Sequence, residues 1–281
     1  MSFLDRISAC NRHDLSGFVP FRVAGQPVGW VRHGLAALLV ARHPVLTVSG
    51  GALVLDARLP DHGARSAAMD AVVRAMERDG LVAGRRDEFY AVATHVGAPE
   101  LLRIERAAVS AFGIAACGVH MTGFVRRADG LHVWVPRRSR DKSTYPGMLD
   151  NTVAGGQPVG LGLHDNMVKE CWEESGIPED LARKAVCTGA ITYRMDAEDG
   201  LKPDVQFCFD LELPADFVPR NTDGEIDEFF AWPWRKAAEV VSETREFKFN
   251  CNLVLIDFFV RHGLVDPGRG DYLDIVAGLR R

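Results

Sequence analysis

The stretch VAGGQPVGLGLHDNMVKECWEESGI, residues 153–177, joins a glycine-rich segment to a short helical pattern and decides the predicted fold. Asp165 is a residue type that often caps a helix, so we expect a helix from there to Ser175. Gly176 and Pro178 are typical of a helix end. The stretch therefore predicts a glycine loop followed by one short helix with a defined end.

This predicted helix carries Glu170, Glu173 and Glu174, and residues three and four apart share a helix face. Like charges at these spacings repel by about 0.2–0.5 kcal/mol per pair, and acidic side chains in the last turn oppose the helix dipole. A hard divalent cation would relieve both penalties, because Mg²⁺ prefers oxygen ligands. On the helix alone, a solvated acidic face explains the three glutamates equally well.

Residues 169–177, KECWEESGI, resemble the second half of the Nudix box, G-x5-E-x7-R-E-U-x-E-E-x-G-U, in which U is a bulky aliphatic residue. Lysine replaces the arginine, Cys171 replaces the first aliphatic residue, and Gly155-Gly156 stands where the leading glycine belongs. Counting back from Lys169 places Leu161 at the first glutamate position, so that glutamate is missing. In the family this glutamate pairs with the arginine. Both partners are altered here, and the resemblance implies a changed loop beside an intact metal-binding half.

Further segments resemble one Nudix subgroup with an extra N-terminal domain, which includes plant Nudix enzymes and the Nudix portion of fungal thiamine pyrophosphokinases. These segments are spread over most of the chain: residues 105–108, 112–114, 118–120, 135–139, 142, 146–151, 153–156 and 223–225. The resemblance implies hydrolysis of thiamine diphosphate, or of its oxidised or damaged analogues, to the monophosphate. The residues by themselves indicate only metal-assisted cleavage of a diphosphate.

The resemblance also implies roles for the residues of the box. Lys169 would orient the helix by pairing with a carboxylate or a loop carbonyl, and Glu170 would bind metal or orient the attacking water. The cofactor would be Mg²⁺, or Mn²⁺ in its place. The implied metal ligands are carboxylates of the helix and one carbonyl of the glycine loop: Glu170, Glu173, Glu174 and Ala154 or Gly155.

Three other segments offer candidate site residues. The acidic turn at residues 222–228 contains Glu225, a candidate base or extra ligand, although a solvated turn is an equal alternative. Arg138 and Lys142 are candidates for binding the substrate phosphates, because arginine can bind phosphate bidentately. Their alternative is a basic surface loop.

Side chains on later strands are candidates for contacting a ring in the substrate. Tyr193 and Gln206 fit this role by position, although a role in the core or on the sheet surface is the alternative. Cys171 occupies an apolar position of the box and is predicted to be core. We expect the histidines near the box to be structural: His120, His132 and His164.

Patterning along the chain predicts an α+β protein with two domains, residues 1–115 and 116–281. The first would be a smaller α+β domain, and the second a Nudix α/β/α sandwich with a mixed sheet. Hairpins are predicted around Gly25, Gly50-Gly51 and Asp129-Gly130. We also expect a helix that Pro99 opens and that runs to Phe112.

Composition limits the partners and the compartment. The chain has 281 residues and a formal net charge of −5, which disfavours nucleic-acid binding. The six cysteines form no C-x-x-C pair, and no apolar run reaches the ~20 residues of a membrane span. We therefore expect a cytoplasmic protein that acts on a small diphosphate, with homodimerisation left open.

Alternatives to the thiamine reading stay open at this stage. One is a Nudix hydrolase of a nucleoside diphosphate derivative or dinucleotide. Another is isomerisation of a prenyl diphosphate, for which no fitting Cys/Glu pair is evident. The last is a non-catalytic protein that binds a ligand through a degenerate box.

Overall fold

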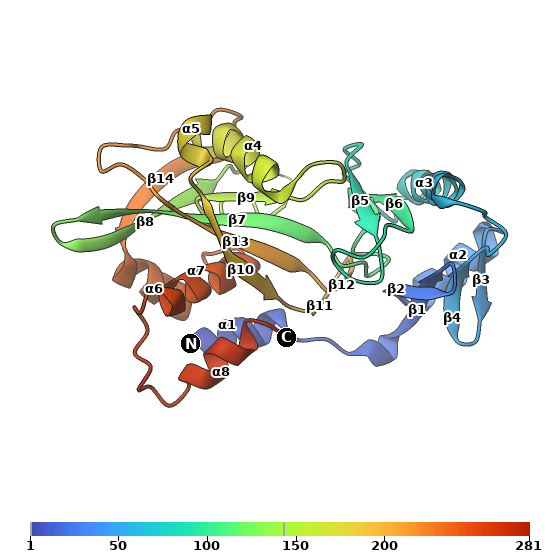
Figure 1. The fold of residues 1–281 in the computed structure, drawn as a ribbon. Helices are drawn as coiled ribbons and strands as arrows, with labels where there is room; N and C mark the ends of the chain where they lie inside the picture. Colours follow the sequence, from blue (N-terminus) through green and yellow to red (C-terminus); the bar gives the residue numbers. More distant parts are fainter. Residues whose placement is uncertain (1, 143) are drawn as a thin grey trace.

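The computed structural model describes residues 2–142 and 144–281. Figure 1 shows two lobes side by side, a larger one around a six-stranded sheet and a smaller one formed by the N-terminal part of the chain. Both lobes combine helices with β-sheet, so the predicted α+β class is confirmed. Among the described residues, none of the helices has the length and apolar character that crossing a bilayer requires.

The sheet of the larger lobe has the strand order β10-β13-β7-β8-β14, and β9 pairs with β7. β13 runs parallel to β7, whereas the other described pairs are antiparallel, which confirms the predicted mixed sheet. The hairpin between β7 and β8 turns at Gly130, whose φ of +120° favours glycine. The strands are β7 (Cys117–Arg127), β8 (Gly130–Arg138), β9 (Val153–Gly156), β10 (Val186–Thr192), β13 (Val205–Glu212) and β14 (Ile226–Pro233).

Helices cover both faces of this sheet, which confirms the predicted sandwich (Figure 1). Val119 and Met121 point to one face and pack with Met167, whereas Phe124 points to the other and meets Phe258 with ring centroids 5.5 Å apart. Side chains alternate along β7 in this way because a strand has a period of two. The first face carries α4 (Leu163–Ser175) and α5 (Glu179–Ala182), and the second carries α6 (Trp234–Glu243), α7 (Phe249–Arg261) and α8 (Tyr272–Gly278).

An N-terminal helix that was not predicted also belongs to the second face. α1 (Phe3–Cys10) begins with a capping box between Ser2 and Asp5. It packs against α7 and α8, and Phe3 stacks on Phe259 at 6.3 Å. The chain then leaves this face to form the smaller lobe.

The smaller lobe runs from the 3-10 helix η1 (Leu15–Gly17) to the 3-10 helix η2 (Arg106–Ala108). It has a four-stranded sheet of order β2-β1-β4-β3, two helices and the hairpin β5/β6, around its own apolar core. Its elements are β1 (Phe18–Val23), β2 (Gln26–Arg32), α2 (His33–Arg42), β3 (Leu46–Ser49), β4 (Ala52–Leu55), α3 (His62–Arg78), β5 (Phe89–Val92) and β6 (Leu102–Glu105). A short hairpin of the larger lobe, β11 (Met195–Ala197) and β12 (Gly200–Lys202), lies near β2.

Two local predictions are wrong. The helix expected from Pro99 to Phe112 is replaced by β6 and η2, because pairing with β5 extends the backbone here. Glu105 then accepts hydrogen bonds from the backbone N–H groups of Arg86 and Ala107, which fixes the turn into η2. Asp165 is not the cap of α4, which begins at Leu163 after Gly162 and has no side-chain cap.

Candidate active site

The acidic face of α4 lines a cavity of about 370 Å³ at the junction of the two lobes, here called the carboxylate cavity. Gly176 ends α4 in the left-handed conformation with φ of +60°, as its position predicted. Cys171 is buried in the opposite direction, against Met167, so its prediction as core is confirmed. The predicted site residues on this cavity come from four segments: Arg138, Lys142, Ala154, Gly155, Lys169, Glu170, Glu173, Glu174 and Glu225.

Glu174 ties the helix to the glycine strand. It is buried, and its Oε2 accepts a hydrogen bond of 2.7 Å from the backbone N–H of Ala154. Burial and the negative charge of Asp150 raise the pKa of Glu174, and burial also raises the pKa of Glu170. Carboxylates that are desolvated in this way are stabilised in their charged form by a nearby cation.

The two glycines of β9 allow side chains of α4 and of the smaller lobe to lie close to the strand backbone. An ideal Cβ on Gly155 would lie 2.4 Å from Cδ of Glu170, so the glutamate side chain lies directly on the strand backbone. A Cβ on Gly156 would lie 1.9 Å from the hydroxyl oxygen of Tyr90, which belongs to the smaller lobe. A side chain at either position would displace a neighbour, the site carboxylate of Glu170 at Gly155 and Tyr90 of the smaller lobe at Gly156.

This donor set fits a hard divalent cation. Three carboxylates converge on the carboxylate cavity beside the backbone carbonyls of β9, and carboxylate and carbonyl oxygens are the ligands that Mg²⁺ and Mn²⁺ prefer. Lys169 supplies positive charge at the same place, since its Nζ donates to Glu173 at 2.5 Å and to Glu170 at 3.1 Å. The lysine thus pairs with carboxylates of its own helix, and its catalytic role stays a prediction.

The loop before α4 is held by amide side chains. Nδ2 of Asn166 donates to the carbonyl of Gly156 at 2.7 Å and to Oε1 of Gln157 at 3.0 Å. Nε2 of Gln157 in turn donates to the carbonyl of Leu161 at 2.6 Å. Sequence reasoning did not find this network, which holds the loop where the family's glutamate–arginine pair is absent.

The basic loop and the acidic turn meet at the cavity. Lys142 forms an ion pair with Glu225, and the backbone N–H of Ser139 donates to the carbonyl of Glu225 at 2.8 Å. The guanidinium of Arg138 is buried, where it donates to Asp150 at 2.7 Å and to two loop carbonyls. Arg138 therefore orders the loop from inside, and contact of Arg138, Lys142 or Glu225 with substrate stays a prediction.

Tyr193 and Gln206 line a second, adjoining cavity of about 230 Å³, here called the aromatic cavity. The Tyr193 hydroxyl donates to Asp204 at 2.9 Å and accepts from Nε2 of Gln206 at 3.2 Å. Burial raises the pKa of Asp204 to about 6. Oε1 of Gln206 is buried and has no hydrogen-bond partner among the described residues, and Phe249 packs edge-on against the Tyr193 ring. The two cavities share lining residues: Arg106, Thr144, Ala154, Gly155, Gly156 and Lys248.

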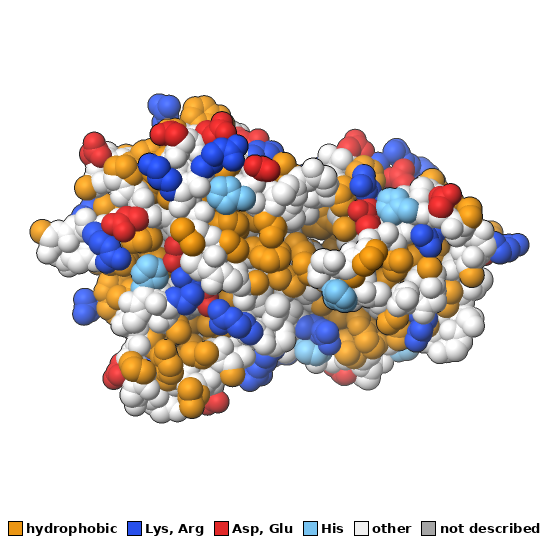
Figure 2. Space-filling model, in the orientation of Figure 1, with side chains coloured by type: hydrophobic (Ala, Val, Ile, Leu, Met, Phe, Trp, Pro, Cys, Tyr) orange, Lys and Arg blue, Asp and Glu red, His pale blue; other side chains and the backbone are white. Residues whose placement is uncertain are grey.

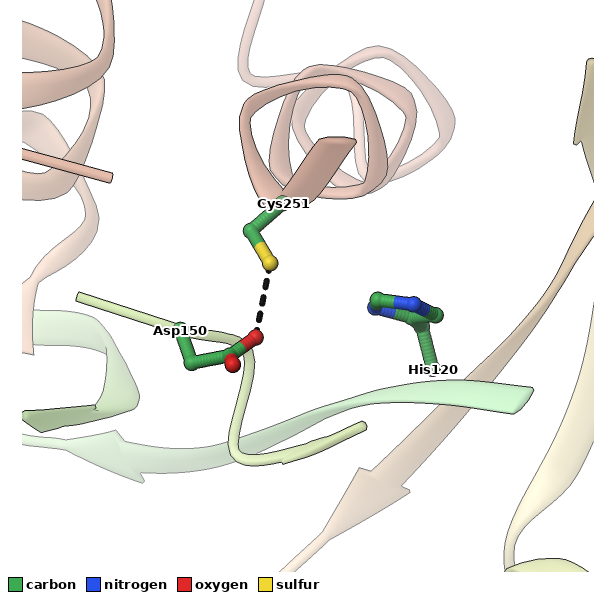
Figure 3. A group of neighbouring side chains, drawn as sticks. All are labelled: His120, Asp150 and Cys251. Carbon is green, nitrogen blue, oxygen red and sulfur yellow. Dashed lines mark hydrogen bonds between the residues drawn. The ribbon is translucent and has the colours of Figure 1, made fainter. Parts of the chain in front are cut away.

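Beneath the aromatic cavity lies a buried group of His120, Asp150 and Cys251, drawn in Figure 3. Cys251 donates its S–H to Asp150 at 2.7 Å, and Nδ1 of His120 contacts Oδ1 of Asn151 at 2.8 Å. Burial lowers the pKa of His120 to about 4. Burial would raise the pKa of Asp150, but Lys248 and Arg138 hold it at about 2. The Asp150 carboxylate therefore balances the cations of Lys248 and Arg138. His120 also lines the aromatic cavity, so its structural role stays a prediction. The other two histidines also bond within the fold, His132 to the carbonyl of Gly130 and His164 to that of Ala185.

Sequence reasoning missed the contribution of the smaller lobe. Arg86, Glu88 and Arg106 line the carboxylate cavity, although each lies far before Gly155, where the box begins. No motif marks them. Residues 105–108 resemble the Nudix subgroup, but this resemblance implied no role for them in the site.

Comparison with known proteins gives one family model and several similar proteins. A family model described as a domain of unknown function (DUF4743) matches residues 2–116. Nudix hydrolase 20, chloroplastic, of Arabidopsis thaliana is 40% identical over 289 residues, which covers 99% of this chain and 77% of that protein. Nudix hydrolase 24, chloroplastic, of the same plant is 41% identical over 282 residues, with the same two coverages.

Solved structures give a more distant likeness. The NUDIX domain of Shewanella oneidensis NrtR, complexed with ADP ribose, covers 55% of this chain and 92% of its own, with 13% identity and a TM-score of 0.42. The plant relatives decide the assignment, because they match nearly the whole chain at about 40% identity. The chain belongs to the Nudix hydrolase family, whose members hydrolyse diphosphate linkages and generally use divalent metal ions.

Proposed function

We propose that this Nudix hydrolase cleaves thiamine diphosphate, or its oxidised or damaged analogues, to the monophosphate with Mg²⁺, for which Mn²⁺ can substitute. The observation that supports this substrate is the adjacency of the two cavities. The carboxylate cavity suits a metal-bound diphosphate, the aromatic cavity suits a ring, and both border the backbone of Gly155 and Gly156. A diphosphate ester with a ring at one end has this division into a charged and an aromatic part.

At the reacting end, Glu170, Glu173 and Glu174 would hold the metal together with a carbonyl of β9. The bound cation would neutralise diphosphate charge and lower the pKa of an attacking water. Glu174 is fixed by its bond to Ala154, so its carboxylate enters the reaction already oriented. Lys169 holds the side chains of Glu170 and Glu173 on the cavity side of the helix.

At the ring end, the contacts suit a flat, nitrogen-containing and cationic heterocycle. Phe249 and Tyr193 provide aromatic surface, and aromatic rings attract cations. Asp204 adds a half-buried carboxylate beside the Tyr193 hydroxyl. The buried Oε1 of Gln206 lacks a partner within the described residues and would accept a hydrogen bond from an amino group of the ligand.

Chromatographic measurement of substrate and products tests the proposal, because it also detects cleavage of ADP-ribose, which releases no inorganic phosphate. Purified protein is incubated with Mg²⁺ and a panel of diphosphates: thiamine diphosphate, oxythiamine diphosphate, ADP, ADP-ribose and a prenyl diphosphate. We expect the highest kcat/KM for a thiamine compound. A nucleotide preferred over both thiamine compounds would refute the substrate assignment and leave the hydrolase assignment standing.

Substitution of a site glutamate tests the metal-binding half of the proposal. Glu174→Gln keeps the size of the side chain and should lower kcat at least about a hundredfold, because it removes a charged ligand where charge develops. Glu179→Gln is the matched control, since Glu179 lies on α5 and its side chain is 68% exposed. Equal loss in both variants, or none in Glu174→Gln, would contradict the proposed site.

A further inference from the structure

The smaller lobe supplies one wall of the catalytic site. Arg86, Glu88 and Arg106 line the carboxylate cavity, and Arg106 also lines the aromatic cavity. Arg106 is thus the residue of the smaller lobe that, like the β9 glycines, borders both cavities. Figure 2 shows hydrophobic side chains at the surface near the junction of the two lobes.

Arg106 is held in place by two bonds to one residue. Its backbone N–H donates to the carbonyl of Glu88 at 2.8 Å, and its Nη1 donates to Oε2 of Glu88 at 2.8 Å. Tyr90, on the strand β5 that follows Glu88, approaches the Gly156 backbone with its hydroxyl. These contacts fix the distance between η2 and β9, and therefore place the guanidinium at the boundary of the two cavities.

The charge and geometry of Arg106 suit a phosphate group. Burial lowers its pKa, but Tyr90, Glu88 and Glu170 outweigh that effect, and the guanidinium stays charged. In the part of the chain that the structure describes, Nε and Nη2 make no hydrogen bond, and the side chain is 41% exposed. The guanidinium fork therefore keeps donors that can bind a phosphate bidentately.

We propose that Arg106 binds the phosphate that stays with the ring after cleavage, and that the smaller lobe thereby forms part of the substrate site. The assignment of this particular phosphate rests on the proposed function. The scissile phosphate belongs at the three glutamates, and the ring belongs beside Tyr193. The phosphate between them would lie at the boundary of the cavities, where Arg106 is found. Glu88 is then a positioning residue for Arg106.

The test compares Arg106→Ala and Arg106→Lys with Arg103→Ala. Arg103 is the matched control, because it belongs to the adjacent strand β6, pairs with Glu100 at 2.7 Å and does not line either cavity. Steady-state kinetics with thiamine diphosphate give kcat and KM. Calorimetry gives the Kd of two probes in the presence of Mg²⁺, thiamine monophosphate and inorganic pyrophosphate. Circular dichroism verifies that each variant is folded.

We expect Arg106→Ala to raise KM and the Kd of both probes about ten- to a hundredfold, which is the effect of losing hydrogen bonds to a charged group. Arg106→Lys keeps the charge but not the fork, so its values should lie between those of the wild type and Arg106→Ala. Arg103→Ala should match the wild type. If Arg106→Ala fails to fold, Arg106→Lys decides alone, and wild-type affinities in that variant would overturn the inference.

The outcomes separate this inference from the proposed substrate. If the wild type does not hydrolyse thiamine diphosphate but Arg106→Ala still loses pyrophosphate affinity, the substrate is wrong and Arg106 remains a phosphate ligand. If the wild type hydrolyses thiamine diphosphate and Arg106→Ala keeps wild-type KM and Kd, the inference is refuted and the substrate stands. A wild-type protein that binds neither probe would overturn the inference as well.

Discussion

Replacing Gly155 by alanine should separate activity from stability. The added Cβ would lie 2.4 Å from Cδ of Glu170, 2.5 Å from Cγ and 2.6 Å from Oε1. Gly155 does not have a positive φ, so alanine can adopt its backbone conformation without strain. The contact is with a flexible side chain, and Glu170 can therefore move away without unfolding the strand.

The size of the effect follows from the distance. Ordinary van der Waals contact begins at about 3.4 Å, so the Glu170 carboxyl must retreat by about 1 Å. A misplacement of about 1 Å in a catalytic arrangement can reduce the rate about a hundredfold. The free energy of unfolding should fall by only about 1 kcal/mol, because only a side-chain rotation is needed.

Kinetics and thermal denaturation together measure both quantities. The assay uses the diphosphate that the wild type hydrolyses best, at saturating Mg²⁺, and Tm is measured on the same preparations. Gly34→Ala is the control, because a Cβ at this position of α2 meets no atom within 4 Å and alanine favours the helix. If Gly155→Ala keeps kcat within about threefold of the wild type, the position of Glu170 against β9 is not required for catalysis.

Two further predictions concern stability. The folded pKa of Asp204 is raised to about 6, so its contribution to stability is complete below the unfolded value of 3.8 and is lost as pH rises through 6. The free energy of unfolding of Asp204→Asn should therefore rise relative to that of the wild type by up to about 3 kcal/mol between pH 4 and pH 8. Urea denaturation measures this difference, and a difference that does not change with pH would contradict the prediction. Arg261→Ala should destabilise the fold by about 3 kcal/mol, because Arg261 bridges Asp210 and Asp257 in a largely buried network. Arg183→Ala, at an exposed ion pair, should leave the free energy of unfolding close to the wild-type value, and similar losses in the two variants would refute the distinction.

The catalytic helix could be predicted because its signals are local. The three- and four-residue spacing of Glu170, Glu173 and Glu174 places them on one face, and Gly176 adopts the left-handed conformation that its position implied. The hairpin at Gly130 was predictable for the same reason, since the turn depends on adjacent residues. The cap of α4 was not, because Asp165 lies inside the first turn and Gly162 enters the helix without a side-chain bond.

The contribution of the smaller lobe could not be predicted, because it depends on contacts far apart in the sequence. Residues 99–112 have helical character locally, yet pairing of β6 with β5 extends part of them into a strand. Arg106 follows that strand and lies at the carboxylate cavity, where its guanidinium donates a hydrogen bond to Glu88. No spacing rule links these residues to a box that begins near Gly155. Contacts of β5 bring them together: Tyr90 packs on Gly156, and the backbone N–H of Val159 donates to the carbonyl of Phe89.

The altered first half of the box is best understood as a change in how the loop is held. Leu161 lines an apolar cavity with Phe207 and Val96, where an unpaired glutamate would be desolvated. The residue that would pair with such a glutamate in the family is Lys169 here, and its ammonium already donates hydrogen bonds to Glu170 and Glu173. Asn166 then orders the loop by neutral hydrogen bonds, which need no counter-ion. Loss of the pair therefore leaves the three glutamates of α4 in place, and Asn166, rather than Leu161, becomes the residue on which the shape of the loop depends.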